Sequence, residues 1–141
     1  MILFLDFDGV LHPVSRETGT FVHLMYFESV IRDFPEVEIV VSSAWREDHS
    51  LKELQSFFSV DIKQRVIDVT PVLHHLSHQY LRQAEILLWL REAGREHEGW
   101  IAIDDSDWLF SPACRNLILV DTNIGFNSAT EKNLRAKLSG Y

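Results

Sequence analysis

Four short apolar runs, separated by segments with helical spacing, constrain the fold of this chain more than any other feature. Each run is nearly continuous and rich in β-branched or aromatic residues, which is typical of strands buried on both faces of a parallel sheet. The predicted strands cover residues 1–7, 37–42, 100–103 and 117–120.

The segments between these runs have the residue patterns of helices. Near residues 47–59, apolar residues recur at spacings of three and four and form one apolar face. Residues 80–93 are rich in helix formers and apolar on much of the helix circumference. A last helix is expected over about residues 128–138, with Asn127 or Ser128 as its N-cap.

The alternation of strands and helices predicts βαβ units, and therefore an α/β fold with a parallel sheet covered on both faces. The chain has 141 residues, of which 46% are hydrophobic, and this fits one globular domain over residues 1–141. The least regular segments are residues 12–22 and 61–78. Pro13 and Gly19 predict a turn or a short hairpin in the first of these segments.

The composition restricts the partners and the compartment. A formal net charge of -8 opposes broad binding to a phosphate backbone, although a local basic site remains compatible with it. One cysteine, Cys114, excludes an internal disulfide and a thiolate zinc cluster, so a reducing cytoplasm is expected. Asp6 interrupts the first apolar run too early for a signal peptide or a membrane span, and no membrane partner is expected.

Acidic residues follow two of the predicted strands. Asp6 and Asp8 end the first run, and Asp104 and Asp105 end the third. Parallel strands bring such residues to one edge of the sheet, where ligands bind in open α/β folds. Four carboxylates at one edge would repel one another unless a cation lay among them, and hard oxygen ligands suit Mg²⁺. The sequence therefore predicts a Mg²⁺ site there.

The same edge offers the groups that phosphoryl transfer needs. Asp6 can attack phosphorus and form an aspartyl phosphate. Asp8 can act as general acid for the leaving oxygen and then as base for the hydrolytic water. Ser42 or Ser43, at the end of the second run, can contact the phosphate near a helix N-terminus. Arg82 is the expected cation.

Several segments resemble the motifs of the haloacid dehalogenase (HAD) superfamily. Its first motif, DxDGxx, carries the nucleophile and the acid/base, and is similar to MILFLDFDGVL. Its second and fourth motifs are similar to EIVVSSAWRE and WIAIDDSD, and its third, a Lys or Arg near a helix start, to RQAEILLWL with Arg82. The resemblance covers residues 1 to about 107, and LILVDTNIGFN is similar to a later segment of small members.

This resemblance implies a Rossmann-like fold and a Mg²⁺-dependent phosphohydrolase. In such an enzyme Asp6 is the nucleophile and Asp8 the acid/base. The Mg²⁺ is held by Asp6, the Asp8 carbonyl, and Asp104 or Asp105. The aspartate two residues after the nucleophile fits phosphatases and phosphotransferases rather than dehalogenases.

The intervals between the motifs are too short for a domain-sized cap. The site is therefore expected to be open, which suits a bulky phosphomonoester or closure by a partner subunit. Small capless members include nucleotidases and polynucleotide end-repair phosphatases, so a nucleotide or a nucleic-acid 3′- or 5′-phosphate is the expected substrate. The acidic net charge argues against a long nucleic-acid footprint.

Some assignments stay open at this stage. Lys63 and Arg65 are alternatives to Arg82 as the phosphate-binding cation, and Arg46 is a candidate for substrate contact. Trp45 and Trp108 closely follow site motifs and are candidate base-stacking residues. A weak zinc pattern involves three histidines, namely His74, His75 and His78.

Two other functions are compatible with the sequence. One is a phosphate or metal sensor that keeps the pocket without turnover. The other is a receiver-like regulatory domain, which the DxD pattern followed by Gly9 disfavours.

Overall fold

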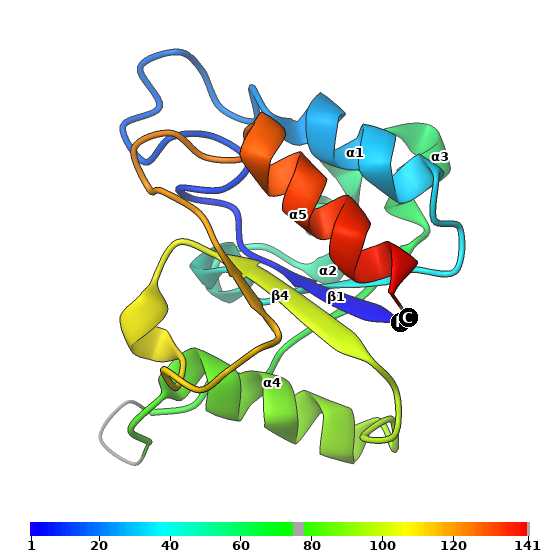
Figure 1. Cartoon of the computed structure of the whole chain (residues 1–141), viewed down its shortest axis with the longest axis vertical. Coiled ribbons are helices and arrows are strands. Elements are labelled where there is room, and N and C mark those ends of the chain that lie inside the picture. The colour runs from blue at the N-terminus through cyan, green and yellow to red at the C-terminus, as the bar shows by residue number, and fades with distance from the viewer. Residues whose placement is uncertain (75–77, 141) are drawn as a thin grey trace.

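A five-stranded parallel sheet forms the centre of the computed structural model, which describes residues 1–74 and 78–140 (Figure 1). The order across the sheet is β3-β2-β1-β4-β5, and each neighbouring pair is parallel. The central strand β1 pairs on both sides, in agreement with its continuous apolar sequence. The strands are β1 (Ile2–Leu5), β2 (Glu38–Val41), β3 (Val66–Val69), β4 (Trp100–Asp104) and β5 (Leu117–Leu119).

The sheet confirms the predicted α/β class and contains one strand more than the sequence predicted. The additional strand, β3, lies at an edge of the sheet, within the segment 61–78 that was expected to be irregular. Asp68 interrupts its apolar run, and the Asp68 carboxylate accepts a hydrogen bond of 2.8 Å from the Trp89 indole. A half-buried edge strand with a polar residue lacks the continuous apolar pattern that identified the other strands.

Helices cover both faces of the sheet. They are α1 (Leu24–Arg32), α2 (Leu51–Ser56), α3 (Val60–Lys63), α4 (Leu81–Glu92) and α5 (Ser128–Ser139), with short 3-10 turns η1 (Ala44–Glu47) and η3 (Asp107–Leu109). Side chains of α1, α2, α3 and α5 join one apolar cluster, and α4 packs on the opposite face (Figure 1). None of the helices in the described part of the chain has the length and apolar character needed to cross a membrane.

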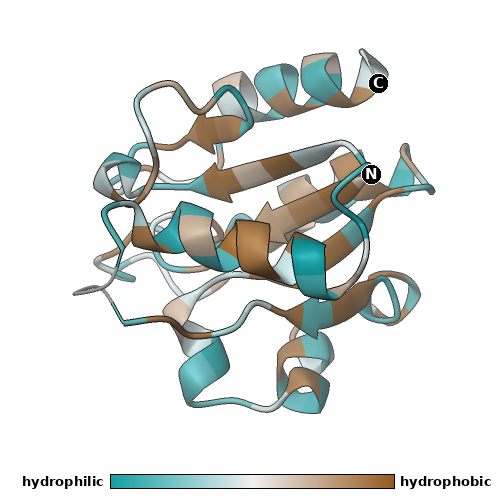
Figure 2. Cartoon of the chain, turned by 90° about the horizontal axis from the view of Figure 1, so that it is seen from below, coloured by the Kyte–Doolittle hydropathy of each residue, from teal (hydrophilic) through white to brown (hydrophobic). Residues whose placement is uncertain are grey.

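The two faces of β1 supply different apolar clusters. Leu3 and Leu5 belong to the cluster with α1 and α5, whereas Ile2 and Phe4 belong to the cluster with α4. This alternation follows from the period of two along a strand. Figure 2 shows the result as hydrophobic strands between helices of mixed character.

The predicted helix boundaries are partly wrong. The expected helix over residues 47–59 is divided, because Ser50 has an extended backbone and caps α2 together with Glu53. The C-terminal helix is confirmed, and Asn127 rather than Ser128 is its N-cap. In each case a side chain that bonds to free backbone N–H groups determines where the helix begins.

The segment 12–22 forms successive turns, and the alternative of a short hairpin is wrong because no strand is found there. Arg16 and Phe21 adopt left-handed backbone angles, with φ of 55° and 60°. Within the described residues, neither the interval from β1 to β2 nor that from β2 to α4 contains a separate cap domain.

Candidate active site

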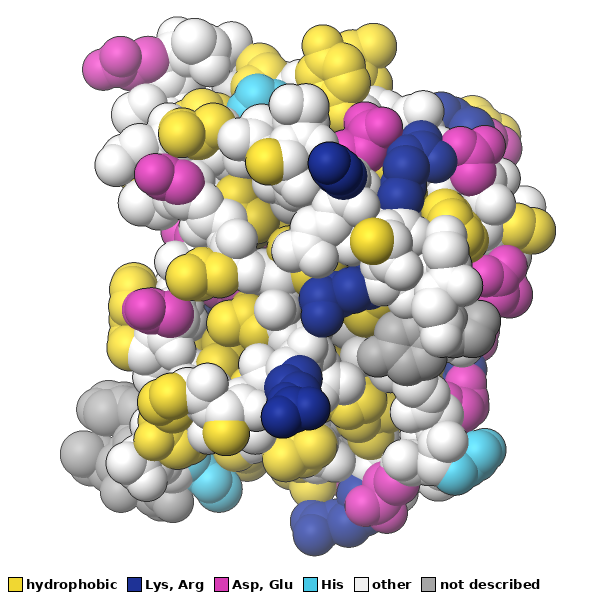
Figure 3. Space-filling view, in the orientation of Figure 1, with side chains coloured by type: hydrophobic (Ala, Val, Ile, Leu, Met, Phe, Trp, Pro, Cys, Tyr) yellow, Lys and Arg dark blue, Asp and Glu magenta, His cyan; other side chains and the backbone are white. Residues whose placement is uncertain are grey.

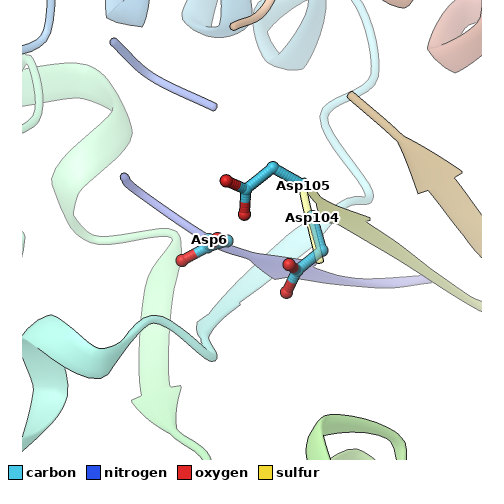
Figure 4. Close-up of side chains that lie close together, drawn as sticks. All are labelled: Asp6, Asp104 and Asp105. Carbon is cyan, nitrogen blue, oxygen red and sulfur yellow. The ribbon is translucent and has the colours of Figure 1, made fainter. Parts of the chain in front are cut away.

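Three carboxylates meet beyond the ends of two neighbouring strands (Figure 4). Asp6 follows β1, Asp104 ends β4, and Asp105 comes next. One carboxylate oxygen of each residue lies within 4.8 Å of the others. The parallel register, which pairs Leu5 with Ile103, places the two strand ends side by side. The structure thus brings together three of the four acidic residues predicted at this edge.

Burial and mutual repulsion change the acidity of this cluster. The pKa of Asp6 is raised well above its usual value by burial and by the negative charge of Asp104, although the nearby Arg82 opposes the shift. The pKa of Asp104 is raised by burial to about 6, despite the opposing effects of Arg82 and of the Ser106 N–H. Full ionisation of the cluster therefore requires additional positive charge.

Arg82 is the cation that the structure brings to this cluster. Its Nη1 lies 2.5 Å from Asp104 Oδ2 and 3.7 Å from Asp6 Oδ1. The alternative Arg65 donates instead to backbone carbonyls at the end of α1 and before β2. Lys63 lines a separate cavity beside α2. Of the three candidate cations, Arg82 alone contacts the clustered carboxylates.

The carboxylate cluster fits a divalent cation. When fully ionised, its three carboxylates carry three negative charges, and the Arg82 guanidinium compensates for one of them. The oxygen donors are of the type that Mg²⁺ prefers, and Asp6 and Asp104 are almost completely buried. Asp6, Asp104 and Asp105 are the residues that would hold the ion, whose binding would displace protons from the two carboxyls with raised pKa.

Gly9 allows Asp105 to approach the first strand. Its φ of +76° is in the left-handed region, and a Cβ at this position would clash with the Asp105 carboxylate. The same Cβ would lie 2.9 Å from the Thr122 hydroxyl. The glycine of the DxDG sequence is therefore required by both the turn and the packing.

The side chain of Asp8 has a different set of partners. Its Oδ1 accepts hydrogen bonds from His12 Nε2 at 2.7 Å and from Arg16 Nη2 at 2.6 Å, and its Oδ2 accepts one from Trp45 Nε1 at 3.1 Å. Burial alone would raise the pKa of Asp8, but these bonds outweigh it and lower the pKa. In this arrangement Asp8 is an ionised carboxylate.

His12 orients Asp8 and was not identified from the sequence. The ring is fully buried, and its Nδ1 accepts a bond of 3.2 Å from the Phe21 N–H. Because Nδ1 is an acceptor, Nε2 carries the proton and donates it to Asp8. In the sequence, the only indication of this contact is that His12 lies four residues after Asp8.

The two serines after β2 differ in their contacts. Ser43 Oγ accepts a hydrogen bond of 3.3 Å from the Trp45 N–H and caps η1. Ser42 is equally buried, and no hydrogen bond joins its hydroxyl to another described residue. The Ser42 hydroxyl is therefore the one left for a ligand.

Arg46, predicted as a substrate contact, is buried and engaged by the protein itself. Its guanidinium lies 2.8 Å from Glu85 Oε2 and donates to the backbone carbonyls of Ser42, Ser43, Thr70 and Pro71. Glu85 also lies 3.8 Å from Arg82. A buried ionic network thus runs from the loop after β2 through Glu85 to Arg82. The sequence spacing between Arg82 and Glu85 does not reveal that Glu85 is buried.

The sequence also indicated Trp108 and three histidines as candidate site residues. Trp108 is 68% exposed on η3. Among the histidines of the weak zinc pattern, His75 lies outside the described residues. No metal-binding group that includes His74 or His78 is found within residues 1–74 and 78–140.

Comparison with known proteins agrees with this geometry. Residues 2–130 match the family described as the HAD domain in Swiss Army Knife RNA repair proteins. No curated protein and no solved structure matches the chain. Since the matched region covers most of the 141 residues, the chain belongs to this family of HAD domains.

Proposed function

We propose that this protein is a Mg²⁺-dependent phosphomonoester hydrolase that acts through an aspartyl phosphate on Asp6. The observation that carries the proposal is the convergence of Asp6, Asp104 and Asp105 with Arg82 at one edge of a parallel sheet. Membership in a HAD family supports the same reaction class.

In the first step a carboxylate oxygen of Asp6 attacks phosphorus while the bond from phosphorus to the ester oxygen breaks. The leaving oxygen receives a proton from Asp8. In the second step water attacks the phosphorus of the aspartyl phosphate, Asp8 accepts the water proton, and the bond to Asp6 breaks to release phosphate. A bound Mg²⁺ would neutralise the carboxylates and the phosphoryl oxygens.

The contacts of Asp8 suit the second step directly. In that step Asp8 acts in the ionised form that its contacts favour, and the proton that it accepts becomes acidic as the bond from the attacking water to phosphorus forms. To act as the acid in the first step, Asp8 has to carry a proton, and at least one of its three hydrogen-bond donors has to leave so that the leaving oxygen can approach. Arg16 is the donor best placed to leave, because its side chain is 43% exposed.

Ser42 is the proposed hydroxyl for the phosphoryl oxygens, since Ser43 already caps η1. Arg82 is the proposed cation for the same oxygens, because it borders Asp6. The contacts of Arg46 favour a role in positioning the loop of Ser42 and Ser43, whereas direct contact with substrate stays a prediction.

The proposed substrate is a phosphorylated nucleotide or a nucleic-acid end. The name of the matched family, which refers to RNA repair, supports a phosphate at an RNA end. The net charge of -8 favours a short footprint, and on the face shown in Figure 3 basic side chains are interspersed with acidic and uncharged groups. A terminal phosphate fits these features better than a long duplex.

Phosphate release from a panel of esters tests the proposal. The panel contains nucleotides, 3′- and 5′-phosphorylated oligonucleotides, phosphosugars and phosphopeptides, each with and without Mg²⁺. We expect Mg²⁺-dependent release that Asp6→Asn abolishes and Asp8→Asn slows in both chemical steps. A folded protein that binds Mg²⁺ and phosphate analogues but releases no phosphate would instead be a sensor.

A further inference from the structure

A cavity of about 440 Å³ opens beside Asp8. It is lined by Asp8, Arg16, Ala44, Trp45, Asp48 and His49. In the proposed reaction Asp8 protonates the leaving oxygen, so the organic part of the substrate lies on the side of Asp8. The position of the cavity therefore suits the leaving group.

An aromatic surface forms one wall of this cavity. The rings of Trp45 and His49 are stacked, with centroids 5.2 Å apart and an interplanar angle of 18°. Phe7, Phe21 and Phe57 pack around the indole with ring centroids at 5.2 to 5.6 Å. A ring that is held in this way is a preorganised surface on which a flat group can stack.

Polar groups surround the aromatic wall. His49 Nδ1 lies 3.0 Å from the Trp45 carbonyl, so Nδ1 carries the proton and Nε2 is left as an acceptor. Asp48 adds an exposed carboxylate, and the Arg16 guanidinium lies 5.1 Å from the centre of the Trp45 ring. The acceptors at the rim of this flat surface match the amino groups at the edge of a nucleobase rather than a phenyl ring, and the guanidinium marks the place over the indole where a flat group can lie.

The charges of the cavity exclude some other leaving groups. Two carboxylates, Asp8 and Asp48, face one guanidinium, so a leaving group with its own negative charge inside the cavity is repelled. A nucleoside is uncharged and flat, and it presents hydrogen-bonding groups at its edge. It therefore fits better than a second phosphate or a carboxylated sugar.

We propose that this cavity is a nucleobase subsite, in which the base of the nucleotide that carries the scissile phosphate stacks on Trp45. The inference rests on the proposed phosphatase function and names the part of the substrate that the site recognises. The base takes the place of the Arg16 guanidinium over the indole. Because the same guanidinium bonds to Asp8 Oδ1, its displacement leaves that oxygen with the His12 bond alone and opens one position on it for the leaving oxygen.

The kinetic test compares substrates that differ only in the terminal base. Short 3′-phosphorylated oligonucleotides with and without the last base are hydrolysed in the presence of Mg²⁺, and a 5′-phosphorylated pair is treated in the same way. We expect kcat/KM to be roughly 5- to 150-fold higher when the base is present, the range that base stacking on an aromatic side chain gives. Equal values for both members of each pair would overturn the subsite and leave the phosphatase function intact.

Variants of Trp45 and His49 separate the stacking of the base on Trp45 from the hydrogen bond between the Trp45 indole and Asp8. Trp45→Phe keeps an aromatic ring but loses the indole N–H, so it should slow both substrates of a pair and preserve most of their ratio. Trp45→Leu and His49→Ala should each lower the ratio. Trp108→Leu is the matched control, because Trp108 lies outside the cavity, and it should leave the ratio unchanged. A ratio that survives Trp45→Leu in a folded protein contradicts the proposal.

A binding measurement tests the nucleobase subsite independently of the proposed phosphatase activity. The indole N–H signals of the four tryptophans are recorded by NMR in the inactive variant Asp6→Asn. The Trp45 signal is the one that is missing from the double variant that carries Asp6→Asn and Trp45→Phe. Adenosine 3′-phosphate or adenosine 5′-phosphate with Mg²⁺ should shift the Trp45 signal, and ribose 5-phosphate should not. If the signal shifts but the wild-type protein releases no phosphate, the proposal of a nucleobase subsite stands and the proposed phosphatase function is wrong. An unchanged Trp45 signal would reject the subsite.

Discussion

Nη1 of Arg82 lies 2.5 Å from Oδ2 of Asp104, which joins the start of α4 to the end of β4 inside the acidic cluster. The Asp104 side chain is 1% exposed and the Arg82 side chain 12%. This ion pair reduces the repulsion between Asp104 and Asp6, and through Glu85 it connects the cluster to the loop after β2. The electrostatic balance of the site therefore depends on one guanidinium.

Removal of this guanidinium should destabilise the protein. We expect Arg82→Met to lower the free energy of unfolding in Mg²⁺-free buffer by about 3–5 kcal/mol, because buried carboxylates lose their counterion. Added Mg²⁺ should restore part of the loss. Urea unfolding with and without Mg²⁺ measures both effects. Arg91→Met, at an exposed position of the same helix, is the control and should change stability by less than about 0.5 kcal/mol.

Without Mg²⁺, the stability should fall as the pH rises from about 5 to 7.5. The pKa of Asp104 is raised to about 6 in the folded protein, so the folded state binds this proton more tightly than the unfolded chain. The corresponding stabilisation is complete below the unfolded-state pKa of about 4 and is lost as the pH rises through about 6; the whole difference is on the order of 3 kcal/mol, of which roughly 1.5 kcal/mol falls between pH 5 and 7.5. The raised pKa of Asp6 acts in the same direction.

Thermal unfolding at both pH values measures this effect. Asp8 and Glu98 have lowered pKa values and stay ionised across this range, so they do not mask it. Mg²⁺ should raise the Tm more at pH 7.5 than at pH 5, because it competes with protons for the carboxylates. Asp6→Asn should raise the Tm of the Mg²⁺-free protein at pH 7.5. A wild-type Tm that rises with pH in the absence of Mg²⁺ would contradict this account of the cluster.

Gly9→Ala should weaken Mg²⁺ binding as well as stability. The left-handed backbone costs about 1–2 kcal/mol for any L side chain, and the new Cβ also clashes with the Asp105 carboxylate. Gly94→Ala is a matched control, since Gly94 has φ of +68° but a Cβ added there would meet no atom within 4 Å. Calorimetric titration of both variants with Mg²⁺ separates the two effects. Equal Mg²⁺ affinity in the two variants would show that Asp105 has no part in the ion site.

Arg46→Met should primarily affect stability. The substitution removes the donor of four backbone carbonyls and leaves Glu85 with fewer partners, for an expected loss of about 3–5 kcal/mol. Glu85→Gln should also destabilise, and the double variant should lose less than the sum of the two single losses. If Arg46 instead binds substrate phosphate, Arg46→Lys would raise KM strongly while the free energy of unfolding changes little.

The sequence anticipated the features that depend on local pattern. Continuous apolar runs identified β1, β2, β4 and β5, and the acidic residues at the ends of β1 and β4 indicated where a site would form. The strand β3 and the division between η1 and α2 escaped this reasoning. An edge strand with an internal Asp68 has no clear period, and the cap at Ser50 competes with continuation of the helix.

By itself, the sequence determined the α/β class and the placement of Asp6, Asp104 and Asp105 at one sheet edge, because parallel strands put their carboxyl ends together. Only the tertiary structure decided that Arg82 rather than Arg65 meets these carboxylates, that Arg46 is buried against Glu85, and that His12, Arg16 and Trp45 surround Asp8. Such contacts join residues whose distance in space is set by how helices and turns pack on the sheet, and no local periodicity encodes that distance.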